Sequence, residues 1–217
     1  MNNFATMSDK STELEIASKL LEIGAIKLKP QAPFTWASGW KSPIYCDNRL
    51  SLSFPEIRTF IKTELAKAIK YNYPEVECIA GVATAGIPQG ALVAEELGLP
   101  FIYVRSKPKG HGMENMIEGK VTPRQKVVVI EDLVSTGGSS LKASDDLIEA
   151  GFKVLGMAAI FTYGFDLAKQ NFESKNVKLV CLSNYSAMLE KALETGYIKQ
   201  EQVDTLQDWR KDPANWG

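Results

Sequence analysis

Residues 127–140 have the sequence VVVIEDLVSTGGSS, and this stretch decides how the rest of the chain is interpreted. It begins with an apolar run, residues 127–130, in which every side chain is β-branched. Such a run is typical of a strand that is buried on both faces of a parallel sheet. Because ligands of open α/β sheets bind beyond the carboxyl ends of the strands, we expect a binding site directly after Ile130.

Two acids and a turn rich in glycine and hydroxyl groups follow this run. Glu131 and Asp132 are expected on opposite sides of the strand end, where carboxylates can accept hydrogen bonds from the two hydroxyls of a ribose. Residues 136–139 lead into an amphipathic helix, whose unpaired N–H groups and positive dipole end attract an anion. The stretch therefore predicts a site for a sugar that carries a 5'-phosphate. The alternative is an ordinary strand-to-helix connection.

A second turn of small residues, GVATAGIPQG at residues 81–90, follows another expected strand. It either wraps an anion or lets the backbone pack closely, and the sequence leaves both interpretations open. Other phosphate motifs are absent: there is no G-x-x-x-x-G-K-[ST], and the glycines around Gly81 and Gly110 do not complete G-x-G-x-x-G.

The composition indicates a single domain over residues 1–217. With 217 residues and 45% apolar content, the chain can bury one sizeable core with a small appendage. Its 25 basic and 26 acidic residues nearly cancel, which argues against nucleic acid or a membrane surface as a partner. No apolar run reaches the length of a membrane span, and the start MNNFATMSDK does not resemble a signal peptide, so we expect a cytoplasmic protein. Cys46, Cys78 and Cys181 are expected to be reduced packing residues.

Apolar runs and turn signals predict alternating strands and helices. Besides residues 127–130, strands are expected at residues 76–80, 101–104, 154–161 and 177–181. Helices are expected from Ser11 or Thr12 to Gly24, from Ser53 and Pro55 to about Lys70, up to Leu97 before Gly98, and at residues 139–150, 165–172 and 187–194. This alternation predicts an α/β fold, a doubly wound, mostly parallel sheet flanked by helices.

Residues 26–50 differ from this pattern, because prolines and Gly39 break them into short pieces. We interpret this segment as a small N-terminal hood over the sheet. Trp36, Trp40 and Tyr45 either pack the hood or flank a planar ligand, and packing is favoured for the tryptophans.

Residues 105–124 form a connection that is unusually long for a compact domain, and we expect a mobile loop there. Arg105, Lys107, Lys109 and His111 alternate along it, so an extended backbone would direct all four to one face and gather positive charge for a polyanion. The alternative is a solvated basic lid without a chemical role.

Taken together, these stretches resemble the type I phosphoribosyltransferases, and within them the orotate phosphoribosyltransferases. The resemblance covers nearly the whole chain. It rests on the signature at residues 127–140, the loop pattern R-x-x-x-K-x-H-G at residues 105–112 and the hood sequence SGWKSPIYCDNR at residues 38–49. It implies the type I phosphoribosyltransferase fold and the transfer of ribose 5-phosphate from phosphoribosyl pyrophosphate (PRPP) to orotate. The products would be orotidine 5'-phosphate and pyrophosphate, in de novo synthesis of pyrimidine nucleotides (UMP).

The resemblance also implies the roles of individual residues. Lys109, His111, Glu131 and Asp132 would be catalytic, with Lys109 as the main cation on the pyrophosphate. Ser135 would contact orotate, and residues 135–139 would hold the 5'-phosphate. The PRPP-binding residues would be Arg105, Lys109, His111, Glu131, Asp132, Leu133, Val134, Ser135, Thr136, Gly137, Gly138 and Ser139.

The chain departs from the family pattern at a few positions. Some members carry lysine where this chain has Ala37, Ala85 and Ser106, and an arginine that touches orotate has no counterpart at residues 162–165. Lys41 and Lys107 are candidates to replace these groups.

The resemblance implies Mg²⁺ as the cofactor, held through PRPP oxygens and waters rather than by a dedicated set of protein ligands. It also implies a homodimer whose active sites are shared, with orotate and PRPP as small-molecule substrates. Two alternatives remain: a phosphoribosyltransferase for another base, such as a purine or uracil, and a regulator on the same fold that senses PRPP and binds RNA or DNA.

Overall fold

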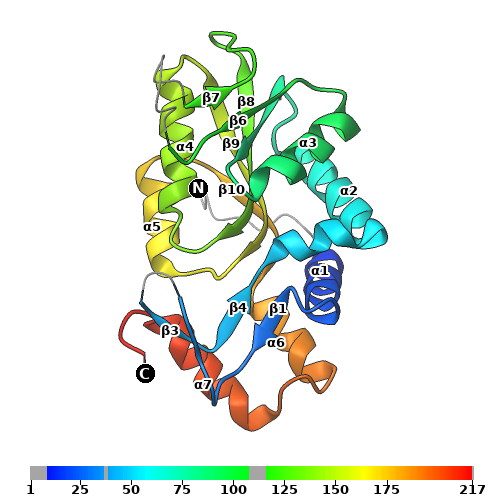
Figure 1. Ribbon diagram of the computed structural model, residues 1–217, viewed down its shortest axis with the longest axis vertical. Coiled ribbons are helices and arrows are strands. Elements are labelled where there is room, and N and C mark those ends of the chain that lie inside the picture. Colours follow the sequence, from blue (N-terminus) through cyan, green and yellow to red (C-terminus); the bar gives the residue numbers. More distant parts are fainter. Residues whose placement is uncertain (1–8, 37–38, 108–115, 217) are drawn as a thin grey trace.

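The computed structural model describes residues 9–36, 39–107 and 116–216. Its centre is a six-stranded sheet, in which β7 at one edge is antiparallel to β6 and the other neighbours are parallel (Figure 1). In spatial order the strands are β10 (Leu179–Asn184), β9 (Lys153–Thr162), β8 (Lys126–Val134), β5 (Cys78–Val82), β6 (Phe101–Val104) and β7 (Ile117–Glu118). The predicted α/β fold with a mostly parallel sheet is confirmed.

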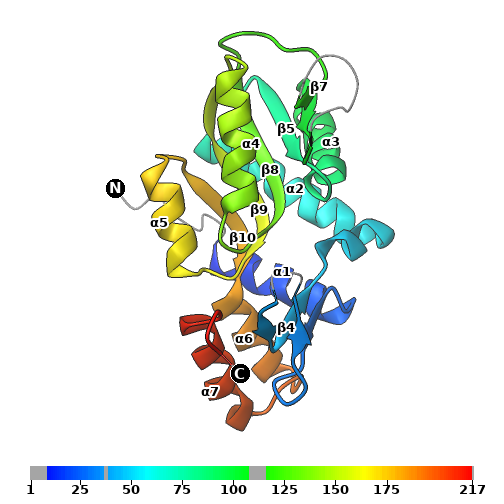
Figure 2. The same cartoon turned by 60° about the vertical axis from the view of Figure 1, so that its left-hand side comes forward.

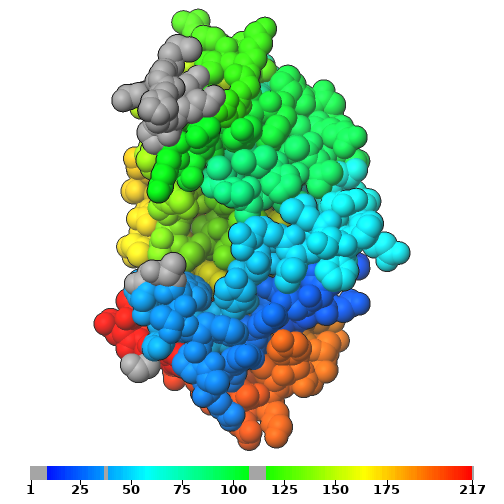
Figure 3. Space-filling model, in the orientation of Figure 1, coloured from blue at the N-terminus to red at the C-terminus, as the bar shows by residue number. Residues whose placement is uncertain are grey.

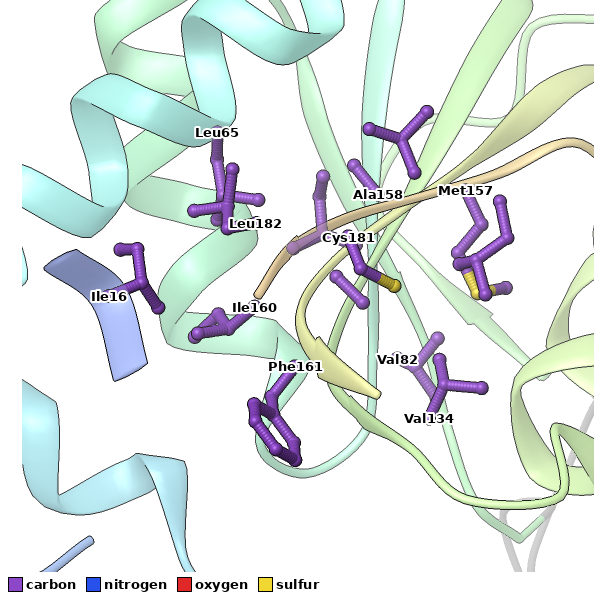
Figure 4. Close-up of a cluster of buried hydrophobic side chains, with 14 of the residues drawn as sticks. Ile16, Leu65, Val82, Val134, Met157, Ala158, Ile160, Phe161, Cys181 and Leu182 are labelled. Atoms are coloured by element: carbon purple, nitrogen blue, oxygen red, sulfur yellow. The ribbon is translucent and has the colours of Figure 1, made fainter. Parts of the chain in front are cut away.

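Helices cover both faces of the sheet. On one face lie α4 (Gly138–Glu149) and α5 (Asp166–Ser174), and on the other lie α1 (Lys10–Glu22), α2 (Pro55–Asn72) and α3 (Gly86–Leu97) (Figure 2). Side chains from alternating strand positions therefore bury on both sides. Ile160 of β9 and Leu182 of β10 lie near Leu65 of α2, whereas Met157 of β9 lies across the sheet (Figure 4).

The hood segment forms small antiparallel pairs rather than a continuous sheet. β1 (Ile26–Leu28) pairs with β4 (Ile44–Cys46), and β2 (Phe34–Thr35) pairs with β3 (Lys41–Ser42). A short 3-10 helix, η1 (Asn48–Ser53), then leads into α2. The C-terminal helices α6 (Tyr185–Glu194) and α7 (Gln200–Lys211) lie beside these strands (Figure 1).

Helix α7, which the sequence analysis did not predict, is fixed to the hood by Trp209. This side chain is fully buried, and its indole Nε1–H donates to the carbonyl oxygen of Lys41 at 3.2 Å. The rings of Trp36, Tyr163 and Tyr185 surround it at centroid distances of 5.6 Å. The two ends of the chain thus share one aromatic core.

Several predicted boundaries were wrong. Helix α1 begins earlier than expected and is capped by Asp9, whose side chain accepts from the Thr12 N–H at 2.8 Å, and not by Ser11 or Thr12. Ser53 does not cap α2. Strands β5 and β10 are shifted by two residues at their starts, and β8 continues to Val134, so both predicted acids lie within a strand. β9 stays paired with β8 as far as Val134, so the strand extends through both acids.

The long connection at residues 105–124 also contains regular structure. Ile117 and Glu118 form β7, which pairs with Val104 and Tyr103 of β6. This edge strand shortens the stretch that lacks secondary structure. Within the described residues, no helix is both long and apolar enough to cross a membrane.

Candidate active site

The candidate site begins where β8 loses one of its two neighbours. β5 pairs with β8 only as far as Ile130, whereas β9 stays paired with it to Val134. On the β5 side, α3 fills the next position, because a Cβ on Gly86 would lie 2.4 Å from the Ile130 carbonyl oxygen. The following acids therefore lie at an open part of the sheet, at its carboxyl edge.

Glu131 is held from inside the protein. Its side chain is only 6% exposed. One carboxylate oxygen accepts from the Ser140 hydroxyl at 2.9 Å, and the other accepts from the backbone N–H of Asp132 at 3.1 Å. Burial, and then the neighbouring charge of Asp132, raise the pKa of Glu131.

Asp132 is less enclosed than Glu131. Burial raises its pKa as well, while hydrogen bonds and the positive charge of Arg49 oppose that rise. Two adjacent acids with raised pKa values are typical of a functional site rather than of a solvated surface. Asp132 is the acid better placed to meet a ligand.

The predicted phosphate cradle is a tight turn supported by α5. Gly137 has φ +82°, and a Cβ there would lie 2.6 Å from the Phe172 ring. The Asn171 side-chain amide donates to the Thr136 carbonyl oxygen at 2.9 Å. Among the described residues no side chain caps α4, so its first N–H groups face outward beside exposed Gly138 and Ser139. Such a helix start favours an anion.

An aromatic pocket lies next to the cradle. Its volume is about 310 Å³, and it is lined by Thr35, Trp36, Tyr45, Cys46, Leu133, Ser135 and Tyr163. The recess between the blue hood and the green upper segments, with lime and yellow atoms at its floor, is visible in Figure 3. Trp36 packs 5.3 Å from Tyr163 and donates its indole N–H to the Ile44 carbonyl oxygen. Trp36 therefore packs the hood, as favoured, and it also lines the pocket; its role in flanking a planar ligand stays a prediction.

Lys41 lies at the edge of this pocket. Its ammonium group donates to the Thr35 hydroxyl at 2.8 Å, and Thr35 lines the pocket. A larger cavity of about 500 Å³ lies between α6 and α7, where Arg210 donates to the Gly164 carbonyl oxygen at 3.4 Å. None of the predicted site residues lines it. The smaller aromatic pocket is the better candidate, because it adjoins Ser135 and the acids.

The second turn, between β5 and α3, is closely packed. A Cβ on Gly81 would lie 2.7 Å from the Gly86 carbonyl oxygen, and one on Gly90 would lie 2.7 Å from the Phe101 ring. Close packing thus accounts for three glycines of this turn, Gly86 included. The turn also contains a cis peptide bond between Ala83 and Thr84. A role in anion binding stays a prediction.

The structure does not gather all the predicted basic groups at the site. Arg105 pairs with Glu118 at 3.1 Å and donates from Nε to the Lys107 carbonyl oxygen. The backbone bends at Ser106 and Lys107, so the described part of this segment does not have the extended conformation that would direct its basic side chains to one face. Lys109 and His111 lie outside the described residues.

Leu133 and Val134, which were also predicted to bind PRPP, have different surroundings. Val134 has its side chain in the core, and its carbonyl oxygen accepts from Thr162 and Tyr163. Leu133 lines the aromatic pocket. The sequence analysis gave no role to Asn48, Ser140 or Asn171. Asn48 and Asn171 reach backbone carbonyl groups from distant elements and carry no motif of their own, whereas Ser140 lies in the signature but its bond to Glu131 depends on the fold.

A dedicated metal centre is not seen in the described part of the chain, where no group of three or more His, Cys, Asp or Glu side chains could hold an ion. Any metal here would depend on oxygen atoms of a bound ligand.

Comparisons with known proteins agree with this geometry. A sequence model described as "Phosphoribosyl transferase domain" matches residues 52–193. A curated protein of Porphyromonas gingivalis, named orotate phosphoribosyltransferase, is 61% identical over 202 residues, covering 93% of this chain and 96% of that protein. One of the same name from Cytophaga hutchinsonii is 58% identical over 202 residues, covering 93% and 97%. The crystal structure of orotate phosphoribosyltransferase from Aeropyrum pernix has a TM-score of 0.74 at 28% identity and covers 85% of this chain and 99% of that chain.

Proposed function

The chain belongs to the orotate phosphoribosyltransferases, and from this premise we propose how its site carries out their reaction. It transfers ribose 5-phosphate from PRPP to orotate and releases pyrophosphate, a step of pyrimidine nucleotide synthesis. One observation carries the assignment to a base: a pocket lined by Trp36, Tyr45 and Tyr163 adjoins Ser135, beside the acids and the phosphate cradle. A flat ring in this pocket would lie next to a ribose 5-phosphate held by residues 131–139.

The reaction separates an anionic leaving group from a ribose carbon that becomes cation-like. Asp132 would accept hydrogen bonds from the ribose hydroxyls and favour positive charge on the sugar. Glu131 would hold the backbone of Asp132 and the start of α4, because its oxygens bond to the Asp132 N–H and to Ser140. The uncapped start of α4 would bind the 5'-phosphate.

The leaving pyrophosphate needs positive charge. Arg105, Lys109 and His111 are proposed to supply it, with Lys109 as the main cation. Arg105 would have to exchange its bond with Glu118 for the pyrophosphate, which is feasible because the Arg105 side chain is 34% exposed. A partly exposed ion pair of this kind contributes only about 0–1 kcal/mol, so its exchange costs little.

Orotate is a flat anion, and the hood provides aromatic side chains for its ring and a positive charge for its carboxylate. The aromatic side chains would stack against its ring, and Ser135 would bond to its polar edge. Lys41 would meet its carboxylate, since the ammonium group already lies on pocket-lining Thr35. Lys41 would thereby replace the lysine that some relatives carry at Ala37, a position outside the described residues.

Mg²⁺ would enter the site bound to the pyrophosphate and ribose oxygens of PRPP, where it would neutralise charge on the leaving group. The nearby protein oxygens fit such an arrangement, because Asp132 is an acid next to the ribose position and no closed cage of protein ligands surrounds it within the described residues.

The assay that tests this function uses purified protein, PRPP, Mg²⁺ and each base in turn. We expect orotate to be consumed and pyrophosphate to be released. Turnover of adenine, hypoxanthine or uracil in place of orotate would show that the base assignment is wrong. The same reaction without Mg²⁺ tests the cofactor.

We also propose a homodimer with shared active sites. Support comes from exposed apolar side chains near η1, with Leu50 at 38% and Phe54 at 41% exposure, and from the prevalence of two-fold dimers among soluble oligomers. A cytoplasmic location, expected from the composition, stays a prediction.

A further inference from the structure

We propose that Asn48 is a positioning residue that fixes Asp132 in place and joins it to the wall of the base pocket. This inference rests on the proposed function, since Asp132 is assigned there to the ribose. Asn48 belongs to η1 of the hood, 84 residues away from Asp132 in the sequence, and its side-chain amide donates to the Asp132 carbonyl oxygen at 2.7 Å.

The bond fills a gap in the sheet. β8 loses β5 as a partner after Ile130, so the backbone of the next residues lacks a strand on that side. A buried backbone carbonyl without a partner costs free energy comparable to a lost hydrogen bond. Asn48 supplies the missing donor at the residue whose side chain faces the ribose.

Both the amide nitrogen and the oxygen of the Asn48 side chain form hydrogen bonds. Asn48 is fully buried, and its side-chain oxygen accepts from the Cys46 thiol at 3.3 Å. Burial raises the pKa of Cys46 well above its usual value, so the thiol keeps the proton that it donates. Cys46 lines the base pocket, so one amide group joins the pocket wall to Asp132.

The network continues to the second turn. The Asn48 carbonyl oxygen accepts from the Ser51 hydroxyl at 2.6 Å, and the Gln89 amide donates to that hydroxyl oxygen at 3.2 Å. Ser51 and Gln89 are both buried, and Gln89 lies in the first turn of α3, which follows the second turn of small residues. Asn48 is therefore the centre of a buried polar network that joins Asp132, the wall of the base pocket and the start of α3.

If Asn48 acts through Asp132, its loss affects the transition state more than the binding of orotate. Small displacements of a catalytic group lower the rate strongly, so we expect Asn48→Ala to lower kcat by roughly tenfold or more. The KM for orotate should change by no more than about twofold, because the pocket side chains remain.

The test combines Asn48→Ala with Asp132→Asn. The double variant should be no slower than Asp132→Asn alone, because residues that act on one another are not additive. A control is Asn72→Ala on α2, which removes the 2.9 Å hydrogen bond from the Asn72 amide to the Ala68 carbonyl oxygen and the 2.7 Å bond accepted from Lys178. It should keep wild-type kcat. If Asn48→Ala lowers kcat by the same factor in both backgrounds, or leaves kcat unchanged, the inference is overturned.

A second variant guards against a failure to fold, and a binding measurement separates the inference from the proposed function. If Asn48→Ala does not fold, as judged by circular dichroism, Ser51→Ala is the second variant. It keeps the Asn48 side chain but removes the Ser51 bonds to the Asn48 carbonyl oxygen and to Gln89, and it should lower kcat in wild type but not in Asp132→Asn. Calorimetry of PRPP binding without orotate should show the same non-additive effect of Asn48→Ala and Asp132→Asn, now on the affinity for PRPP. If the effects of Asn48→Ala and Asp132→Asn on PRPP binding are coupled but orotate is not turned over, the proposed function is wrong and the inference about Asn48 is right. Turnover without coupling, or no PRPP binding at all, would overturn the inference.

Discussion

At the scale of single residues, Glu131 and Asp132 are neighbours with different surroundings. Glu131 has both carboxylate oxygens bonded inside the protein, to Ser140 and to the backbone of Asp132. Asp132 is more accessible and is held through its carbonyl oxygen by Asn48. Hydrogen bonds inside the protein thus hold the Glu131 carboxyl group in place, whereas the proposed role of the Asp132 carboxyl group is to meet the ligand.

Asp132→Asn should lower kcat by roughly tenfold to a thousandfold, because the amide cannot favour positive charge on the ribose as a carboxylate does. The fold should persist, since the side chain is not part of the apolar core. Steady-state kinetics with orotate and PRPP measure the effect. The control is Asp145→Asn, which removes an exposed ion pair with Lys175 and should be nearly as active as wild type. Near-normal activity of Asp132→Asn would place the ribose elsewhere.

Glu131 should make stability depend on pH. Burial raises the pKa of Glu131 from 4.5 to about 8, so between these values the folded protein keeps a proton that the unfolded chain releases. The stabilisation is complete below the lower value and is lost as the pH rises to about 8. In Glu131→Gln, the fall in Tm between about pH 5 and about pH 8 should be smaller than in wild type. Glu173→Gln on α5 is the control and should keep the wild-type slope; equal slopes in all three proteins would contradict the prediction.

Lys41→Ala should raise the KM for orotate by about tenfold, because a hydrogen bond to a charged group contributes about 1.5–3 kcal/mol. The KM for PRPP should stay unchanged, since Lys41 lies in the hood and bonds to Thr35. The matched control is Lys67→Ala, which removes an exposed partner of Glu64 on α2. An unchanged KM for orotate would mean that its carboxylate is bound by another group.

At the scale of secondary structure, apolar runs predicted five of the six strands of the sheet but missed the edge strand β7 and most of the strand ends. β8 continues through Glu131 and Asp132 because β9 keeps pairing with it, and a pairing partner cannot be read from the run itself. Helix α7 was missed because its sequence is mostly polar, and only Val203, Leu206 and Trp209 are buried. The signature gave the acids and the cradle, whereas Asn48 and Asn171 reach the site from distant elements and have no local pattern.

Gly86 sets how closely α3 approaches β8. Gly86→Ala would place a Cβ 2.4 Å from the Ile130 carbonyl oxygen, and backbone atoms cannot yield as a flexible side chain can. We expect a loss of roughly 1–3 kcal/mol in the free energy of unfolding, measured by urea denaturation. Gly138→Ala is the control, because its Cβ would have its nearest neighbour at 4.0 Å. Equal stability of the two variants would show that α3 shifts without cost.

At the scale of the whole molecule, the proposed dimer predicts that inactive chains rescue one another. Lys109→Ala and Asp132→Asn should each be nearly inactive alone. If the loop of one subunit serves the site of the other, each mixed dimer has one site with both lesions and one with neither. After random exchange, activity should recover to about a quarter of wild type.

Subunit exchange must be shown separately, for example with one tagged chain. If exchange occurs and no activity returns, each loop serves its own subunit, and the shared site is excluded. Size-exclusion chromatography with light scattering tests the dimer itself.

The bond between Trp209 and the hood also bears on how the protein is made. Hood residues 26–50 are synthesised well before α7, yet one of the rings against which Trp36 packs, that of Trp209, belongs to α7. The strands that carry the phosphate cradle are complete once β10 has ended at Asn184, before α7 exists. During translation, the sheet and the phosphate cradle can therefore assemble before α7 joins the hood. A nascent chain that has left the ribosome only as far as Asn184 would have a finished sheet, while the hood would still lack the Trp209 ring behind Trp36.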